Sequence, residues 1–288
     1  MTTPPTPQPA HLYLRIAGKR LGIVRYEEEQ PARIATASYH LNPQMSLVAN
    51  LREAYGKEPL LRAPASGSVE VMVSAPVTVV PLTDFQEENC AAIYAFCFPG
   101  EEHVRVFYDI VAAADCVVHF ALKEASCRAL EDFYESVHYT SGFTPFIRHC
   151  AAKGTDLPCE RRFFVYIHDR RADLVAFSGQ ALLIVNSYAI DGMVDVAYYL
   201  TDVARQYNGR LSAADFKDPA MAPAGTDAYD AVYVMADGQD TLDAAVCELR
   251  QFALNVRKVS APAEFNRHVA ATSPDVSYDL LTLLLDNP

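Results

Sequence analysis

Three adjacent pairs of basic residues are the first features of this chain that could bind a ligand. The pairs are Lys19-Arg20, Arg161-Arg162 and Arg170-Arg171. Clustered positive side chains can hold a phosphate or carboxylate group, even in a protein whose net charge is −12. Each pair also lies beside an expected strand, where two basic residues in a solvated turn need no ligand. The basic pairs therefore leave an anion site and an ordinary surface turn open.

The candidates for acid–base and nucleophilic catalysis are weak. Asp191 and Asp195 stand four residues apart where a helix is expected to begin, as paired carboxylates in an acid–base site would. Capping of the helix by Asp191 explains the same pattern. The chain has no G-x-S-x-G motif, which would place a serine nucleophile on a strand-to-helix turn. We therefore expect Asp191 to be a cap and assign no catalytic residue.

Metal-ligating residue types are present, but their spacing does not build a metal site. Cys116 and His119 are three apart on an expected strand, so their side chains point to opposite faces. His149, Cys150 and Cys159 lack a fourth ligand for tetrahedral zinc. The seven cysteines include no C-x-x-C pair. We therefore expect no metal and reduced thiols, as is typical of a cytoplasmic protein.

An internal repeat determines how these residues are positioned. Residues 13–16 and 164–167 read as equivalent strands, and each is followed after a short turn by a second strand, at residues 23–26 and 174–177. All four segments share one offset of 151 positions. Each copy continues with a third strand and then a helix. The repeat predicts a duplicated α/β architecture.

Alternating apolar residues, turn residues and helix caps predict the other elements. In the first copy we expect strands at 12–16, 21–26, 33–39, 69–73, 77–81, 104–110 and 116–122, and helices at 43–55, 85–96 and 123–138. In the second copy we expect strands ending near 188, at 231–235 and at 256–259, and helices at 193–207, 241–254 and from residue 273.

Composition places the chain among globular proteins. With 288 residues, of which 51% are hydrophobic and 21% charged, it is long enough for two domains. We expect lobes at residues 11–158 and 159–288, after a disordered proline-rich tail at 1–10 that lacks the features of a signal peptide. No apolar run is long enough to cross a bilayer. The acidic net charge opposes binding to nucleic acid or anionic membranes, so we expect neither as a partner.

The layout and a few short motifs resemble a known family. The motifs are residues 78–81 (TVVP) before 85–89 (FQEEN), then 185–188 (VNSY), and Asp195 with 198–200 (YYL). On these the chain resembles bacterial proteins grouped as domain-of-unknown-function family 3822, which are placed with the actin-like ATPases. The resemblance covers residues 12–285. It implies two ribonuclease-H-like lobes, each a mixed sheet with a three-stranded antiparallel start flanked by helices. It implies no established activity.

The resemblance also points to two hairpin turns that would face each other across a cleft. In the superfamily each turn carries an Asp followed by a Gly, which organise a hydrated metal ion and approach the phosphates of ATP. Here the first turn has Gly18 and Lys19 but no carboxylate, and the second has Asp169 and Arg170 but no glycine. These four residues are the candidate phosphate-binding, and hence cofactor-binding, positions. Asp237-Gly238 is the one candidate remnant of the adenosine-binding glycine pair, although a lone Asp-Gly pair is more often an ordinary turn.

The incomplete turns argue against magnesium-dependent phosphoryl transfer, because the metal supplies most of that catalysis. We therefore expect a pseudoenzyme without a cofactor that binds another protein. A group of tyrosines fits either a core or a partner surface; it comprises Tyr188, Tyr198, Tyr199 and Tyr207.

Two alternatives stay open. The chain is either a divergent ATP-binding protein or kinase that uses Asp169 and the basic turn residues, or a metal-free binder of an anion or metabolite in the cleft. A deep open cleft between Gly18 and Asp169 would favour these ligand-binding alternatives. A cleft filled by side chains such as Arg15 or His168 would favour the protein-binding role.

Overall fold

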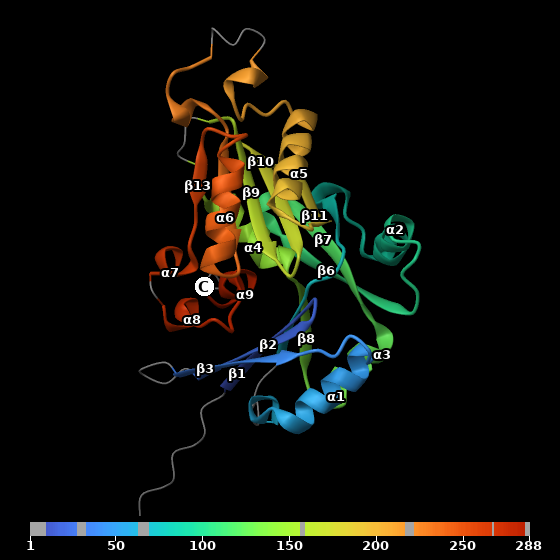
Figure 1. Cartoon of the computed structure of the whole chain (residues 1–288). Helices are drawn as coiled ribbons and strands as arrows, with labels where there is room; N and C mark the ends of the chain where they lie inside the picture. The colour runs from blue at the N-terminus through green and yellow to red at the C-terminus, as the bar shows by residue number, and fades with distance from the viewer. Residues whose placement is uncertain are drawn as a thin grey trace, which may run out of the picture.

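The computed structural model of the chain describes residues 10–27, 33–62, 69–155, 159–216, 222–266 and 268–285. Its strands form two five-stranded sheets and one three-stranded sheet. Figure 1 shows the first sheet below, with β1 to β3 in blue, and the second sheet above, with β9 to β11 in yellow-green.

The first sheet has the strand order β3-β2-β1-β4-β8. Its first three strands are antiparallel, and β4 and β8 then add in parallel to β1. The bounds are β1 Ala10–Ala17, β2 Arg20–Glu27, β3 Arg33–His40, β4 Val69–Val73 and β8 Val137–Ser141, with the covering helices α1 Leu47–Lys57 and α3 Glu124–Glu131. Leu14, Ile23 and Val71 alternate onto the face that packs against Leu51 of α1 and Leu130 of α3.

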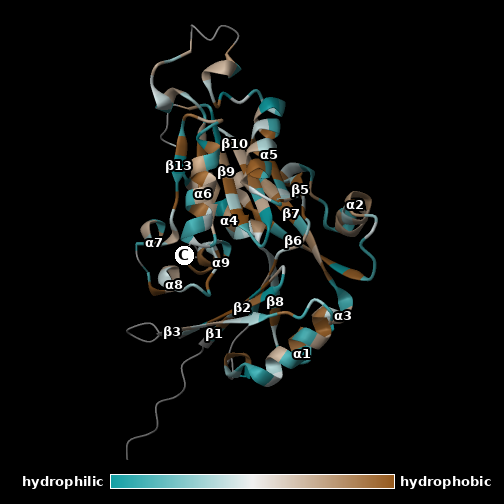
Figure 2. Ribbon diagram, in the orientation of Figure 1, coloured by the Kyte–Doolittle hydropathy of each residue, from teal (hydrophilic) through white to brown (hydrophobic). Residues whose placement is uncertain are grey.

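The second sheet repeats this order as β11-β10-β9-β12-β13. The bounds are β9 Arg161–His168, β10 Arg171–Ser178, β11 Ala181–Ala189, β12 Ala231–Ala236 and β13 Val256–Lys258, with α5 Met193–Gln206 and α6 Gln239–Leu249. Val165 and Ile167 of β9 pack against Leu200 of α5 and Val246 of α6. Figure 2 shows these hydrophobic strands in brown beneath the two helices.

The two sheets confirm the predicted fold class. Each begins with three antiparallel strands and continues with parallel ones, with helices on a face. The strand β1 corresponds to β9, and the register of β4 on β1 is matched by that of β12 on β9. The common order supports the predicted internal duplication.

A second layer of helices lies between the two sheets. It comprises α4 Phe143–Ala152, α7 Ala261–Glu264, α8 Val269–Thr272 and α9 Tyr278–Leu285. The core there combines Met72 of the first sheet, Phe146 of α4, Tyr166 of the second sheet and Leu281 of α9, all fully buried. The two lobes therefore share one continuous apolar core instead of meeting at a loose hinge.

The third sheet is inserted between β4 and β8. Its order is β5-β7-β6, with bounds β5 Thr78–Pro81, β6 Val104–Val111 and β7 Cys116–Lys123. The helix α2, Cys90–Cys97, packs on it after the 3-10 turns η2 Leu82–Asp84 and η3 Glu87–Asn89. Figure 1 shows α2 at the outer margin of the molecule. The remaining 3-10 turns are η1 Pro59–Arg62, η4 Ala112–Ala114, η5 Ala213–Asp215 and η7 Thr226–Ala228.

Several predicted elements are wrong. The expected helix at 123–138 ends at Glu131, and Val137 already begins β8. Val137 fits the helical spacing after Leu130 and Phe133 as readily as it alternates with Tyr139 along a strand. The helix α4 was not predicted. The last helix begins at Tyr278, not at residue 273, and the helix expected from residue 85 begins at Cys90.

Two predictions about domain limits are not tested. Residues 1–9 of the predicted tail lie outside the described residues, and β1 already begins at Ala10. The predicted division near residue 158 stays a prediction, since residues 156–158 also lie outside them. Within the described parts of the chain, no helix is both long and apolar enough to span a bilayer.

Candidate functional site

The tips of the two equivalent hairpins touch each other. Gly18 and Lys19 join β1 to β2, and Asp169 and Arg170 join β9 to β10. Gly18 has φ +52°, which suits the first position of a type II′ turn, whereas Asp169 and Arg170 have φ values of +44° and +60° that cost energy in residues with a side chain. A Cβ atom placed on Gly18 would lie 3.0 Å from the Cβ of Asp169. The structure therefore brings Gly18 and Asp169 together, with no phosphate-sized gap between their backbones.

The two basic candidates border different cavities. Arg170 forms an ion pair with Asp191, and both side chains are largely exposed. Lys19 is exposed and borders a separate cavity beside Asn42. Arg170 lines a cavity of about 240 Å³ together with Asp169. A further cavity beside the hairpins is lined by Arg20 and not by Lys19 or Arg170. Binding of a ligand by Lys19 or Arg170 stays a prediction.

Arg15 connects the two lobes at this point. It lies on β1 opposite Gly22 and is 4% exposed. Its Nε atom donates to Asp279 Oδ2 at 2.7 Å, and an Nη atom donates to Asp169 Oδ2 at 3.2 Å. Its other Nη atom lies 3.1 Å from His168 Nδ1. A Cβ atom placed on Gly22 would lie 3.4 Å from the Cβ of Arg15, which is an ordinary contact distance.

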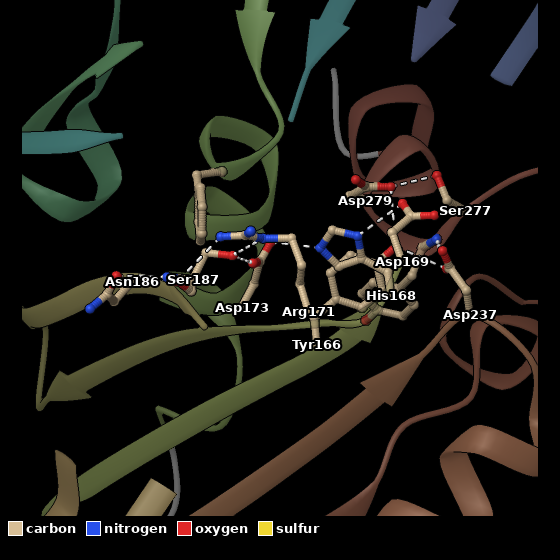
Figure 3. A network of polar contacts seen from close by, with 12 residues as sticks. Tyr166, His168, Asp169, Arg171, Asp173, Asn186, Ser187, Asp237, Ser277 and Asp279 are labelled. Atoms are coloured by element: carbon tan, nitrogen blue, oxygen red, sulfur yellow. Dashed lines mark hydrogen bonds and ion pairs between the residues drawn. The ribbon is translucent and has the colours of Figure 1, made fainter. Parts of the chain in front are cut away.

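The carboxylates around Arg15 belong to a buried network of the second lobe (Figure 3). The Tyr166 hydroxyl donates to Asp237 Oδ1 at 2.9 Å and lies 3.3 Å from Asp279 Oδ1. Asp279 also accepts from the backbone N–H of Leu280 at 2.8 Å. The backbone N–H of Tyr278 donates to Asp237 at 3.0 Å. The start of α9 is thus fixed to the end of β12 by one shared set of hydrogen bonds.

His168 extends the network away from the cleft. Its Nε2 atom lies 2.8 Å from Asp173 Oδ2 and its Nδ1 atom 3.3 Å from Asp169 Oδ2. Burial lowers the pKa of this imidazole, but Asp173 and Asp169 raise it to about 10, against the opposing charge of Arg15. His168 is therefore a second cation in the network at neutral pH.

Burial and neighbouring charges shift the pKa values of the ionisable groups in this network. Burial opposes the charge of Arg15, yet Asp279, Asp237 and Asp169 raise its pKa well above the ordinary value. Burial also opposes the charge of Asp169, but His168 and Arg15 lower its pKa. Burial raises the pKa of Asp237, against the attraction of Arg15. Asp169 and Asp279 thus pair with Arg15, whereas Asp237 accepts from the Tyr166 hydroxyl and the Tyr278 backbone N–H.

A cavity of about 530 Å³ lies beside the hairpins. Arg20, Ser38 and Asp237 line it, and residues 271–278 form another wall. Gly238 follows β12 with φ +95° at the start of α6, so the Asp-Gly remnant does lie at the edge of this cavity. The volume falls in the range of small-molecule sites.

The other predicted chemistry is not assembled into a site. His119 Nε2 lies 3.5 Å from Cys90 Sγ, a pairing that the strand spacing could not reveal. Within the described residues, no three histidine, cysteine or acidic side chains are arranged so that they could hold a metal ion. The expected cap at Asp191 is wrong, because Gly192 is the N-cap of α5. The backbone N–H of Gly192 donates to the Asp195 carboxylate at 3.1 Å. The Asp191 carboxylate instead pairs with Arg170.

Sequence reasoning identified Arg15 and His168 as possible cleft-filling residues but missed Asp279, Asp173 and Tyr166. A signal existed for Asp279, which is an acid beside a run of leucines in a terminal helix and so needs a buried partner. Tyr166 holds the position equivalent to Arg15 in the second copy, at the same offset of 151.

Solved structures resemble the chain over nearly its whole length. A Bacteroides thetaiotaomicron protein with an actin-like ATPase fold and unknown function has 19% sequence identity and a TM-score of 0.77, covering 96% of this chain and 96% of that one. The PilM-PilN type IV pilus biogenesis complex contains a chain with 14% identity and a TM-score of 0.53, covering 99% of this chain and 100% of that one. At these identities the likeness shows the fold.

A search of curated proteins found no match. The family model described as "Protein of unknown function (DUF3822)" matches residues 3–209, which is most of the chain. This match agrees with the strand order and the actin-like fold described above. The chain therefore belongs to the DUF3822 family, and its fold is that of the actin-like ATPases.

Proposed function

We propose that this protein is a non-enzymatic member of the actin-like fold that binds another protein and whose interlobe cleft is locked. The observation that carries the proposal is the position of Arg15. Its guanidinium, supplied by the first lobe, lies between Asp169 and Asp279 of the second lobe. The proposal includes lobes at residues 11–158 and 159–288 that arose by duplication, and a cytoplasmic location.

Two features of the hairpin tips oppose nucleotide binding. A bound phosphate chain would need the hairpin tips to stand apart, but Gly18 is packed directly on Asp169. A magnesium ion would need carboxylates that lack other partners, but Asp169 is already paired with Arg15 and His168. Opening the site would separate Arg15 from Asp169 and Asp279, and breaking such buried ion pairs costs several kcal/mol.

A protein-binding role is consistent with the fold as it is used elsewhere. One of the similar structures is a chain of a complex named for two proteins, PilM and PilN. A locked pair of lobes is also a rigid body, which keeps a binding surface preorganised and reduces the entropy lost on association.

Thermal unfolding with nucleotides tests the proposal. We expect ATP or ADP at about 5 mM, with or without Mg²⁺, to raise the melting temperature by less than about 1 °C, since a ligand stabilises only the state that binds it. A larger Mg²⁺-dependent rise that is lost in Asp169→Ala and kept in Arg170→Ala would overturn the proposal and favour the divergent ATP-binding protein or kinase.

A metal-free anion or metabolite binder is the second candidate, favoured by the cavity beside the hairpins. Arg20 is exposed and lines this cavity next to the Arg15 network. If this candidate holds, inorganic phosphate or ADP without Mg²⁺ should raise the melting temperature, and Arg20→Ala should abolish the rise. Stabilisation that does not depend on Arg20 would exclude this cavity as the binding site.

A further inference from the structure

The helix α2 differs from an ordinary surface helix because it has no polar face. Its eight residues, Cys90–Cys97, read CAAIYAFC and include no charged or amide side chain. A helix on the surface of a monomer normally turns polar residues to solvent. Figure 2 colours this helix in brown and pale tones at the margin of the molecule.

Only a narrow stripe of α2 packs on the third sheet. Cys90 and Tyr94, four residues apart, are 6% and 2% exposed. The Tyr94 hydroxyl donates to the carbonyl of Pro76 at 3.3 Å, and its ring lies 4.7 Å from that of Phe98. The half-buried Ile93 and the Cys97 thiol, 3.6 Å from the Thr78 hydroxyl, complete the side of the helix that packs on its own domain.

The opposite face of α2 is exposed and apolar. Phe96 is 88% exposed, the largest exposure among the exposed large hydrophobic side chains of the described residues. Ala91, Ala92 and Ala95 lie beside it and are exposed as well. We call these four residues the α2 face. Small alanines around one aromatic ring leave room for a partner to approach the helix closely.

Acidic residues flank the α2 face on both sides. Asp84, Glu87 and Glu88 are exposed in the turns before the helix, and Glu101 and Glu102 are exposed after it. No lysine or arginine occurs between residues 62 and 105. Lys123 pairs with Glu101 at 3.0 Å, so the acids before the helix contribute most of the local negative charge.

We infer that the α2 face is a docking surface for a protein segment that has an apolar centre and lysine or arginine residues at its flanks. The inference rests on the proposed protein-binding function and names its surface and the chemistry of the partner. The apolar centre would cover Phe96 and the alanines, and the basic flanks would lie against Glu87 and Glu88. Such complementary charges steer encounter and select the partner.

The same charges oppose the other occupants of this face. A second copy of the chain, docked through its own α2, would bring acidic flanks onto acidic flanks in either orientation. An anionic membrane would be repelled as well. The α2 face therefore fits a basic, apolar segment of a different protein.

Selection from a peptide library tests the inference on the full chain. The probe is a phage-displayed random library of peptides of about 16 residues, roughly four helical turns. Enriched peptides are synthesised and measured by fluorescence anisotropy against wild type, Phe96→Asp, the double variant Glu87→Lys/Glu88→Lys and Val194→Asp. Val194 of α5 is 66% exposed and serves as the matched control. Circular dichroism confirms that each variant is folded.

We expect enriched peptides to combine large apolar residues with lysine or arginine. Phe96→Asp should weaken their binding by at least about tenfold, as loss of an aromatic anchor does. The double lysine variant should weaken binding mainly at low salt. Val194→Asp should have no effect.

Three results would overturn the inference. Peptides that bind Phe96→Asp as well as wild type would place protein binding elsewhere and leave the proposed function standing. An absence of enriched peptides would remove the α2 face as a peptide-binding site. A wild-type dimer in sedimentation that Phe96→Asp dissociates would make a second copy the occupant. Failure of the proposed function would appear separately, as magnesium-dependent stabilisation by nucleotide.

Discussion

Replacing Arg15 by methionine isolates the charge that joins the two lobes. Methionine keeps much of the length of the side chain but removes the guanidinium from Asp279 and Asp169. Both members of the Arg15–Asp279 pair are 5% exposed in their side chains. Removing one partner of a buried pair leaves the other charge without compensation and costs about 3–5 kcal/mol. Since Arg15 also repels the nearby His168 cation, we expect the lower end, about 3 kcal/mol.

The assay is urea unfolding at pH 7, followed by far-ultraviolet circular dichroism, with the slope against urea checked for two-state behaviour. A double-mutant cycle with Asp279→Asn separates the pair from its surroundings. We expect the double variant to be more stable than the sum of the single effects predicts, by at least about 1.5 kcal/mol. Arg170→Met is the matched control, because this arginine is exposed and its pair with Asp191 should contribute less than about 0.5 kcal/mol.

The reasoning would be refuted if Arg15→Met lost less than about 1 kcal/mol, or if the effects of Arg15→Met and Asp279→Asn were simply additive. Either result would mean that the charges are solvated in solution and that Arg15 does not lock the lobes. An Arg170→Met effect as large as that of Arg15→Met would point to a general loss of surface charge instead.

Three further predictions concern pH and backbone packing. The pKa of His168 is raised from 6.5 to about 10, so protonated His168 stabilises the fold. This stabilisation is complete below pH 6.5 and is lost as the pH rises through 10. The free energy of unfolding should therefore fall by about 3 kcal/mol between pH 7 and pH 9.5. The fall should be smaller in Asp173→Asn. A free energy of unfolding that does not change with pH in urea unfolding would contradict this prediction. Burial raises the pKa of Glu70 from 4.5 to about 7, so its charged form destabilises the fold. Glu70→Gln should stabilise the protein by about 1–2 kcal/mol at pH 8, after discounting for solvent screening, and hardly at all at pH 4.5; equal gains at both pH values would rule out this cause. Gly18→Ala should cost at least about 1 kcal/mol more than Gly179→Ala in urea unfolding, because both have positive φ but only Gly18 is in close contact with the other hairpin. Equal costs would show that the hairpin tips do not touch.

Much of the fold follows from local sequence signals. The repeated strands at residues 13–16 and 164–167 and the turns after them could be predicted, because side-chain alternation and turn residues act over a few positions. The boundary of β8 could not be predicted, since Val137 fits both the helical spacing after Phe133 and the strand alternation with Tyr139. The helix α4 lacks a capping side chain at Gly142 and so escaped notice. In these segments tertiary packing decided between equal local preferences.

The candidate site, like the fold, could be predicted only in part from the sequence. The sequence by itself determined the residues at the two hairpin tips, namely a glycine without an acid in one and an acid without a glycine in the other. Only the tertiary structure decided that Arg15 pairs with Asp279, 264 positions away. No local pattern encodes that contact, because it depends on how two sheets close around a shared core. The sequence thus specifies which charges are available, and the packing of the lobes specifies which of them are buried together.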